Sequence, residues 1–163
     1  MLRPSFVPPP QIRQLRDLTR YRVDLLAART AEKQRVEKLL EDALIKLSVV
    51  VSDAFGASGR AIMAALIAGE RDPAVLANLA RGSLRSKTAR LTEALTGRFT
   101  DHHAFLLTQM LHRVDSVTAD IATVQARIDE QVGELGSAVD AFVDAGRVPV
   151  DCTLPPPRAS PSG

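Results

Sequence analysis

Residues 107–142 read LTQMLHRVDSVTADIATVQARIDEQVGELGSAVDAF. Large apolar side chains recur in this stretch at every seventh residue, and further ones fill the intervening fourth position. The first set is Leu107, Val114, Ile121, Ile128, Leu135 and Phe142, and the second is Met110, Val117 and Val124. Such a repeat forms a stripe that stays in line only when the helix supercoils around a partner. The stretch therefore predicts a coiled-coil helix, whose seam must be covered by another helix of this chain or by a second copy.

The helix that carries this seam is expected to begin at Thr100 or Asp101. Either side chain has an oxygen that can accept the free amides of the first turn. From there the helix should run to about Val132. The glycines at positions 133 and 136 each cost about 1 kcal/mol relative to alanine. The helix is therefore expected to end between Val132 and Val143.

A second long helix is predicted at the front of the chain. No glycine or proline interrupts residues 11–55, and aliphatic side chains recur there at helical spacing. We expect this helix to run from Gln11 to about Val50. The four prolines of residues 1–10 remove backbone donors and disfavour helix, so an extended lead-in is expected there.

Short helices are expected between the two long ones. The first should cover residues 60–68 and end at the glycine that follows. In the second, Asp72 caps the N-terminus, Pro73 takes the first helical position and Gly82 stops the helix. The third is expected over residues 84–96, again ended by a glycine.

These elements predict an all-α fold. The two long helices form an antiparallel coiled coil, and two or three short helices join them and pack at one end. Residues 11–145 are then one helical coiled-coil domain, between the extended Pro-rich lead-in of residues 1–10 and a disordered tail at 146–163. The β-branched Val114, Ile121 and Ile128 favour a two-stranded seam, but they do not distinguish pairing within a chain from pairing between chains.

The composition restricts the class of protein. Of the 163 residues, 45% are hydrophobic and only 4% are aromatic, so the core must be aliphatic. The single cysteine, Cys152, excludes an internal disulfide and a Cys-based zinc site, which fits a reducing cytoplasm. The longest apolar runs are far shorter than the ~20 residues of a membrane span, and the start lacks the apolar core of a signal peptide. We expect a cytoplasmic protein that contacts no membrane.

Basic residues concentrate toward the front of the chain. Residues 1–50 contain 10 Lys or Arg against 6 Asp or Glu, whereas residues 101–163 contain 4 against 9. Contacts with nucleic acid are therefore expected from Arg13, Arg16, Arg20, Arg22, Arg29, Lys33, Arg35 and Lys38. Helical spacing places those at positions 13, 16, 20, 35 and 38 on one outward face. The alternative is an ordinary solvated face, whose charges pair with carboxylates four residues away.

A second group of basic residues lies among the short helices. It comprises Arg60, Arg71, Arg81, Arg85, Lys87, Arg90 and Arg98. The local sequence SLRSKTAR, residues 83–90, combines cations with hydroxyl groups, a mixture that suits phosphate contacts. It equally suits an exposed helix, and the sequence does not separate the two.

The sequence offers no constellation for catalysis. His102 and His103 are adjacent and point about 100° apart on a helix, and Asp101 is better explained as a helix cap, so no metal site is expected. No serine occupies a Gly-x-Ser-x-Gly elbow, and there is no Walker loop and no Gly-x-Gly-x-x-Gly motif. We expect no catalytic residue, no cofactor and no small-molecule substrate in this chain.

Several stretches resemble one known family. They are SFVPPPQIRQLRDLTRYR (5–22), KLLEDALIKLS (38–48), VVSDAFGASGR (50–60), ALIAGERDP (65–73) and GRFTDHHAF (97–105). In this order and at these distances they are similar to the middle segment of insertion-sequence transposases of the "one-ten" family. The resemblance covers roughly residues 2–132.

The resemblance implies a part in DNA transposition. Such transposases join a RuvC-like nuclease domain, whose Asp-Glu-Asp-Asp set uses magnesium, to a helical coiled-coil segment and a C-terminal domain with a catalytic serine. Family members recombine DNA with a structured guide RNA, and the coiled coil helps to assemble the oligomer. None of the catalytic motifs has a match here, so we expect a transposase fragment from a truncated or frameshifted reading frame. Its expected partners are DNA, guide RNA, and further copies or full-length transposase.

Two other hypotheses remain open. The chain could be an interaction protein that joins full-length transposase through the heptad seam as a regulator, or a non-functional remnant. A stand-alone enzyme is the third hypothesis, and it lacks the groups that chemistry requires.

Overall fold

A computed structural model describes residues 9–51 and 53–144 of the chain. They form α1 (Pro10–Asp42), α2 (Leu47–Val50), α3 (Ala57–Ile67), α4 (Pro73–Asn78), the 3₁₀ helix η1 (Gly82–Lys87), α5 (Thr88–Ala94) and α6 (Asp101–Asp144). Most of the expected lead-in, the expected tail at 146–163 and Cys152 lie outside the described residues. Over the part that is described, none of these helices combines the length and the apolar content that crossing a bilayer requires.

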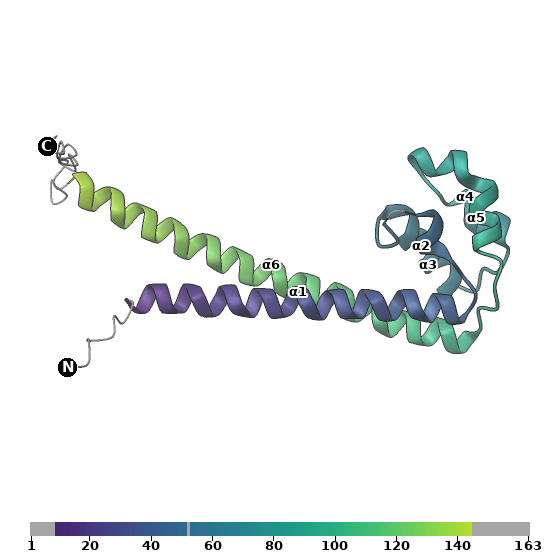
Figure 1. Cartoon of the computed structure of the whole chain (residues 1–163), viewed down its shortest axis with the longest axis horizontal. Coiled ribbons are helices and arrows are strands. Elements are labelled where there is room, and N and C mark those ends of the chain that lie inside the picture. Colours follow the sequence, from purple (N-terminus) through teal and green to yellow (C-terminus); the bar gives the residue numbers. More distant parts are fainter. Residues whose placement is uncertain (1–8, 52, 145–163) are drawn as a thin grey trace, which may run out of the picture.

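The predicted all-α fold with two long helices is confirmed. α1 and α6 pack against one another in opposite directions, and residues 9–51 and 53–144 contain no strand. Figure 1 shows a hairpin with α2 to α5 gathered at one end. We call residues 47–94, which carry α2 to α5, the cap. The end of the hairpin beside the cap is the closed end, and the opposite end is the open end.

The first long helix ends at Asp42, so the prediction that it would continue to about Val50 was wrong. The chain turns because Leu44 adopts a left-handed backbone, with φ 62°. Glycine is the residue that normally occupies such a position after a helix. With leucine there, the sequence carries no visible sign of the turn.

Two hydrogen bonds define this turn as a Schellman motif. The amide of Leu44 donates to the carbonyl of Glu41, and the amide of Ile45 donates to the carbonyl of Leu40, each at 2.8 Å. An apolar contact between the residues at the two ends commonly accompanies the motif. Here Leu40 and Ile45 are both buried in the core. Packing of this pair offsets the strain at Leu44.

We expect Leu44→Gly to raise the free energy of unfolding by about 1 kcal/mol. A left-handed backbone costs an L-residue about 1–2 kcal/mol, and glycine avoids this cost while gaining some freedom in the unfolded chain. The leucine side chain is 55% exposed, so its loss forfeits little burial. Urea denaturation measures the change. Leu44→Ala is the control, because alanine keeps the strain; an equal gain in that variant would contradict the backbone explanation.

The short helices are more numerous than the two or three that were expected. Over residues 47–94, apart from the undescribed residue 52, four short α-helices and one 3₁₀ helix occur. The predicted cap at Asp72 is confirmed, since its Oδ1 accepts the amide of Ala74 at 2.9 Å and Pro73 takes the first helical position. The region expected as one helix over 84–96 is divided between η1 and α5.

The helix that begins at Pro73 ends at Asn78, short of the expected end at Arg81. The reason lies in a contact with α3, because the amide of Arg81 donates to the buried Ser58 Oγ at 2.9 Å and not to a helical carbonyl. Gly82 then turns the chain with φ 62°. A tertiary hydrogen bond of this kind cannot be predicted from local spacing.

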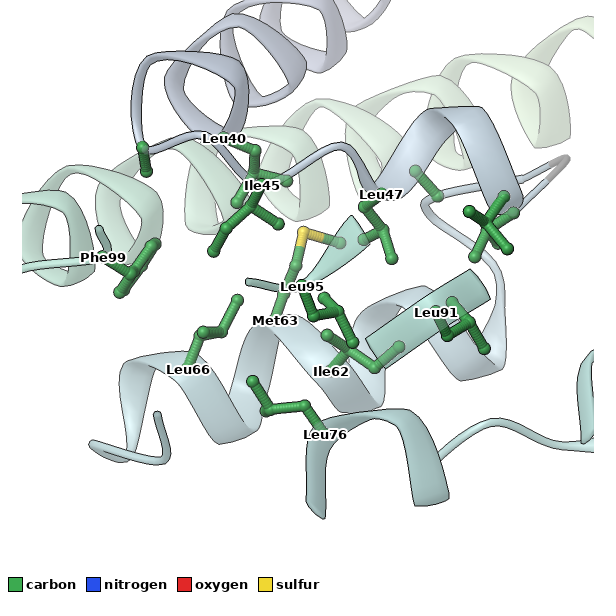
Figure 2. Packing of buried hydrophobic residues seen from close by; sticks show 14 of the residues in the cluster. Leu40, Ile45, Leu47, Ile62, Met63, Leu66, Leu76, Leu91, Leu95 and Phe99 are labelled. Atoms are coloured by element: carbon green, nitrogen blue, oxygen red, sulfur yellow. The ribbon is translucent and has the colours of Figure 1, made fainter. Parts of the chain in front are cut away.

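The cap and the closed end share one aliphatic core (Figure 2). Ile62, Met63 and Leu66 of α3 are buried there with Leu76 of α4 and Leu91 of α5. Leu40 of α1 and Leu47 of α2 join the same cluster, together with Ile45 and Leu95 from the connecting segments. The cap is therefore fixed to the hairpin by continuous packing.

Gly97 allows two turns of the closed end to approach closely. A Cβ at this position would lie 2.4 Å from the carbonyl oxygen of Ala43 and 2.9 Å from Ile45 Cγ1. The same oxygen accepts the amide of Arg98 at 2.7 Å. It cannot move away without losing that hydrogen bond, so the segment before α6 stays close to the end of α1.

Gly97→Ala and Gly133→Ala should change stability in opposite directions. The first inserts a methyl group against backbone and should lower the free energy of unfolding by about 1–3 kcal/mol. The second has no neighbour within 4 Å of its new Cβ, and better helix propensity should raise stability by about 1 kcal/mol. Urea denaturation of both variants tests the pair. Changes of the same sign would contradict the close approach at Gly97.

The seam predicted for α6 faces α1, and its burial declines toward the open end. Leu107 and Val114 are 0% and 1% exposed, and Ile121 is 9% exposed. The other described seam residues, Met110, Val117, Val124, Ile128 and Leu135, are half-buried. Figure 1 shows the cause, because α6 diverges from α1 toward the open end. The chain thus covers its own seam at the closed end and covers it only in part at the open end; the side chain of Phe142 is outside the described parts.

Candidate nucleic-acid interface

The eight basic residues predicted to contact nucleic acid all lie on α1, in two environments. Those at positions 13, 16, 20, 35 and 38 are exposed, whereas those at 22, 29 and 33 are half-buried. The exposed group is the one that helical spacing assigns to an outward face. The half-buried group lies on the sides that meet α6 and the cap.

Arg35 takes part in an ion cluster around a buried carboxylate. Its Nη1 donates to Glu32 Oε1 at 2.8 Å, and Nε of Arg113 in α6 reaches the same oxygen at 2.8 Å. The Glu32 side chain is 7% exposed, while those of Arg35 and Arg113 are 62% and 71% exposed. A buried carboxylate requires such partners, because desolvation strongly disfavours an unpaired charge. The cluster sets the register of α1 against α6.

Sequence reasoning did not identify Glu32. The available signal is its place seven residues after Leu25, which puts a carboxylate in line with the aliphatic residues that face α6. Charged residues are rare at such positions unless they are paired. The partner Arg113 is 81 positions further on, so only the fold brings the pair together.

Removal of both arginines should destabilise the chain more than the sum of the single changes. Arg35→Ala or Arg113→Ala alone leaves Glu32 one partner and should cost about 1 kcal/mol, whereas the double variant leaves a buried, unpaired carboxylate and should cost about 3 kcal/mol or more. Urea denaturation of the three variants gives the coupling.

Glu32→Leu in the double-variant background is the matched control. It removes the unpaired charge and should restore most of the lost stability. Simple additivity of the two single changes, or no recovery with leucine, would contradict the importance of the buried charge.

Lys33 and Arg22 are poorly placed for phosphate contacts. Lys33 Nζ lies 4.8 Å from the centre of the Phe55 ring, so its charge makes a cation–π interaction with the cap. Arg22 Nε is buried and has no hydrogen-bond partner in the described structure. Arg29 is half-buried beside them. These three residues contribute to packing at or near the hairpin and are not part of an open basic surface.

Arg13, Arg16 and Arg20 remain as an outward basic group at the open end. Among the residues described, no ion pair involves any of the three. They span seven positions of α1, or about 10 Å along the helix axis. Lys38 is exposed on the same helix but close to the closed end. The open-end group is therefore an exposed basic surface on α1 without an ion-pair partner among the described residues.

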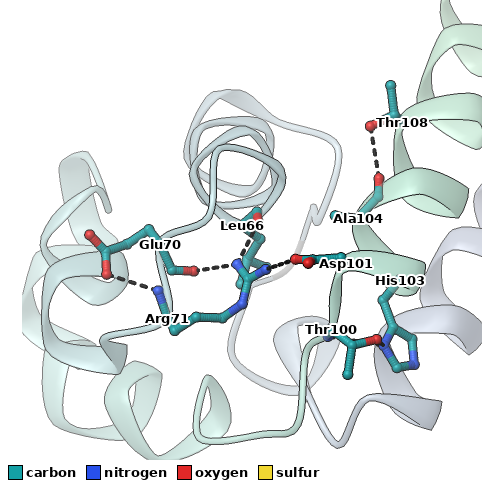
Figure 3. A network of polar contacts seen from close by, with 8 residues as sticks. All are labelled: Leu66, Glu70, Arg71, Thr100, Asp101, His103, Ala104 and Thr108. Atoms are coloured by element: carbon teal, nitrogen blue, oxygen red, sulfur yellow. Dashed lines mark hydrogen bonds and ion pairs between the residues drawn. The ribbon is translucent and has the colours of Figure 1, made fainter.

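Two basic residues of the cap region have structural partners. Arg60 forms a bidentate ion pair with Asp115 of α6, in which Nη1 donates to Oδ2 at 3.2 Å and Nη2 donates to Oδ1. Arg71 donates to the carbonyls of Leu66 and Glu70 at 2.7 and 2.9 Å, and its Nη2 lies 3.6 Å from Asp101 Oδ1 (Figure 3). Both guanidinium groups therefore tie the cap to α6.

The outer part of the cap carries a separate basic group. Arg85, Lys87 and Arg90 are exposed along η1 and α5. Arg81 and Arg98 are exposed as well, although the Arg81 amide bonds to Ser58 within the cap and the Arg98 amide bonds to Ala43 at the end of α1. This second predicted group is thus divided between structural residues and open ones, and its open members lie at the opposite end of the hairpin from Arg13.

His103 caps the start of α6. The hydroxyl of Thr100 lies 2.7 Å from His103 Nδ1, and the amide of Thr100 donates to the same nitrogen at 3.1 Å. The bond to the Thr100 amide corresponds to the returning half of a capping box, with histidine as the acceptor. In residues 9–51 and 53–144 no three His, Cys, Asp or Glu residues gather as a metal site would require.

Comparisons with known proteins add no identification. No family model, no curated protein and no solved structure matches the chain. A proposal for the function of the chain therefore rests on its sequence and on the arrangement of the described residues.

Proposed function

We propose that this chain is the helical coiled-coil segment of a one-ten-type insertion-sequence transposase, and that it binds RNA or DNA through the outer face of α1. The observation that carries the proposal is the outward group of Arg13, Arg16 and Arg20. It combines three fixed positive charges, all of them exposed, on the part of α1 that lies at the opposite end of the hairpin from the cap (Figure 1). The sequence resemblance supplies the transposition context.

The physical basis is electrostatic. A guanidinium group that neutralises a phosphate releases a condensed counterion, and this release favours binding at low salt. Arginine also offers a planar set of donors that fits two phosphate oxygens. Contacts with phosphates do not distinguish one base sequence from another. We therefore propose that the arginines hold the sugar-phosphate backbone of the nucleic acid without recognising its bases.

The proposal assigns no strand cleavage to the described part of the chain. In the family, cleavage belongs to the nuclease domain and to the serine domain, and no catalytic motif of either has a counterpart in this sequence. The proposed contribution is to hold nucleic acid and to take part in assembly. Magnesium belongs to the nuclease domain of the family and is not part of this site.

Charge reversal at the open end tests nucleic-acid binding. Fluorescence anisotropy with a structured RNA and a duplex DNA should show an affinity that falls as salt rises. Arg13→Glu, Arg16→Glu and Arg20→Glu together should weaken binding at least tenfold. They should also lower the salt slope by about 1 for each phosphate that the variant no longer neutralises.

The matched control reverses three charges on the cap, with Arg85→Glu, Lys87→Glu and Arg90→Glu. It changes the net charge by the same amount at the other end of the hairpin. Binding that is insensitive to salt and to the α1 variant would contradict the proposal. Equal loss of affinity in both triple variants would indicate a response to net charge alone.

The second candidate function is association with full-length transposase. The observation that favours it is the divergence of α6 from α1, which leaves Val132 50% exposed near the seam. Co-purification with a full-length transposase of this type, without RNA or DNA present, would separate this function from nucleic-acid binding.

A further inference from the structure

A cavity of about 440 Å³ lies at the closed end of the hairpin, where the turn after α1 and the cap helices α2 and α5 meet (Figure 1). We call it the cap pocket. Val50 of α2 and Ala94 of α5 belong to its lining, and they are buried and half-buried. The amide of Lys46 donates to the carbonyl of Ala94 at 2.9 Å, so the turn and the end of α5 are joined at the pocket. Its size is that of a cleft that can hold a ligand or a few side chains of a partner.

Two large aliphatic side chains of the cap pocket are exposed to water. Leu44 is 55% exposed and Val49 is 67% exposed, and both line the cavity. Val49 has the largest exposed fraction among the large apolar side chains of the described residues. Exposed aliphatic side chains that gather at a hollow are typical of a contact with another molecule.

The fold does not account for a leucine at position 44. Its backbone is left-handed, with φ 62°, and glycine would adopt this conformation without strain. The packing of Leu40 against Ile45 stabilises the turn, but the exposed side chain of Leu44 adds little to the core. Strain of this kind is often kept at positions that serve a function. We take the side chain of Leu44 to be kept for a contact outside the chain.

The charges of the cap pocket favour an anionic partner. Lys46 and Arg90 line it and are exposed, and neither takes part in an ion pair among the described residues. Glu93 is the carboxylate of the lining, so two cations stand against one anion. The hydroxyl of Thr96 donates to the carbonyl of Thr92 at 2.8 Å, which leaves its oxygen free to accept a further donor.

An acidic peptide with an aliphatic residue fits this combination. Its carboxylate would pair with Lys46 and Arg90, its aliphatic side chain would lie against Leu44 and Val49, and its backbone amides would find acceptors in the pocket. A nucleic acid fits less well, because none of the described residues that line the pocket is aromatic and Glu93 repels phosphates.

We propose that the cap pocket binds a short peptide segment of a partner protein, in which an aspartate or glutamate stands beside a leucine, isoleucine or valine. Exposed ion pairs contribute little affinity, so the aliphatic contact supplies most of the binding free energy and the cations select the acidic peptide. The site contains no residue of the arginine group on α1 and none of the heptad seam. It is therefore independent of nucleic-acid binding.

Selection of peptides against the full chain, free of nucleic acid, tests the proposal. A library of random short peptides displayed on phage should yield sequences that combine Asp or Glu with Leu, Ile or Val. The most enriched peptide, synthesised with a fluorescent label, then gives the affinity by anisotropy. Val49→Asp should weaken its binding at least tenfold, and so should Lys46→Glu combined with Arg90→Glu.

Leu44→Gly separates binding from folding. This variant relieves the strained backbone and should be more stable than the wild-type chain, but it removes an exposed side chain of the pocket. Binding of the selected peptide should fall at least fivefold. Unfolding cannot explain a loss of binding in a chain that has become more stable.

Matched controls carry the same changes elsewhere on the cap. Val75→Asp alters a valine of α4 that is 44% exposed and does not line the pocket. Arg85→Glu combined with Lys87→Glu reverses two exposed charges outside the lining. Both controls should bind the peptide within twofold of the wild-type chain.

Three results would overturn the proposal. The first is a selection that enriches no acidic and aliphatic combination. The second is a selected peptide that binds Val49→Asp or Leu44→Gly as well as it binds the wild-type chain, which would place its site elsewhere. The third is binding of duplex DNA or structured RNA that the change of Lys46 and Arg90 to glutamate abolishes, which would assign the pocket to nucleic acid.

Discussion

The packing of α6 against α1 is the constraint on which the rest of the structure depends. An aliphatic stripe with a 3.5-residue period cannot remain in water, and α1 covers it within the same chain from Leu107 to Ile121. The buried Glu32, held by Arg35 and Arg113, gives that packing one register. The cap then locks the closed end through the aliphatic core and the arginine contacts to α6. The basic surface of α1 takes its orientation from this pair of helices.

The two faces of the hairpin follow from the same geometry. A helix that packs on one neighbour has one buried stripe and leaves the remainder of its surface for other uses. On α1 the remainder carries the exposed Arg13, Arg16 and Arg20, and the latter two border apolar side chains such as Ile12 and Val23. The proposed contact with nucleic acid uses this arginine group.

The sequence was sufficient for the fold wherever a periodic pattern or a helix cap carried the information. The heptads from Leu107 onward and the Asp72-Pro73 cap led to the correct elements, and the antiparallel arrangement followed from two long helices joined by short ones. It was insufficient where long-range contacts decide. The turn at Leu44 is held by the burial of Leu40 and Ile45, and the early end of the helix before Arg81 results from its bond to Ser58. Neither contact leaves a local signature. For the candidate site, helical spacing identified the exposed arginines, but it could not show that Lys33 faces Phe55 or that Glu32 is buried.

Whether the seam is closed within one chain can be measured by pulsed electron spin resonance with spin dilution. Labels would replace the exposed Gln34 of α1 and His112 of α6, with Cys152 changed to serine, and the labelled chain would be mixed with an excess of unlabelled chain. The account predicts a single label-to-label distance of about 20–30 Å, given helix axes about 8–10 Å apart, and this distance should persist at every dilution. Its disappearance on dilution would mean that the two helices belong to different chains and would contradict the hairpin.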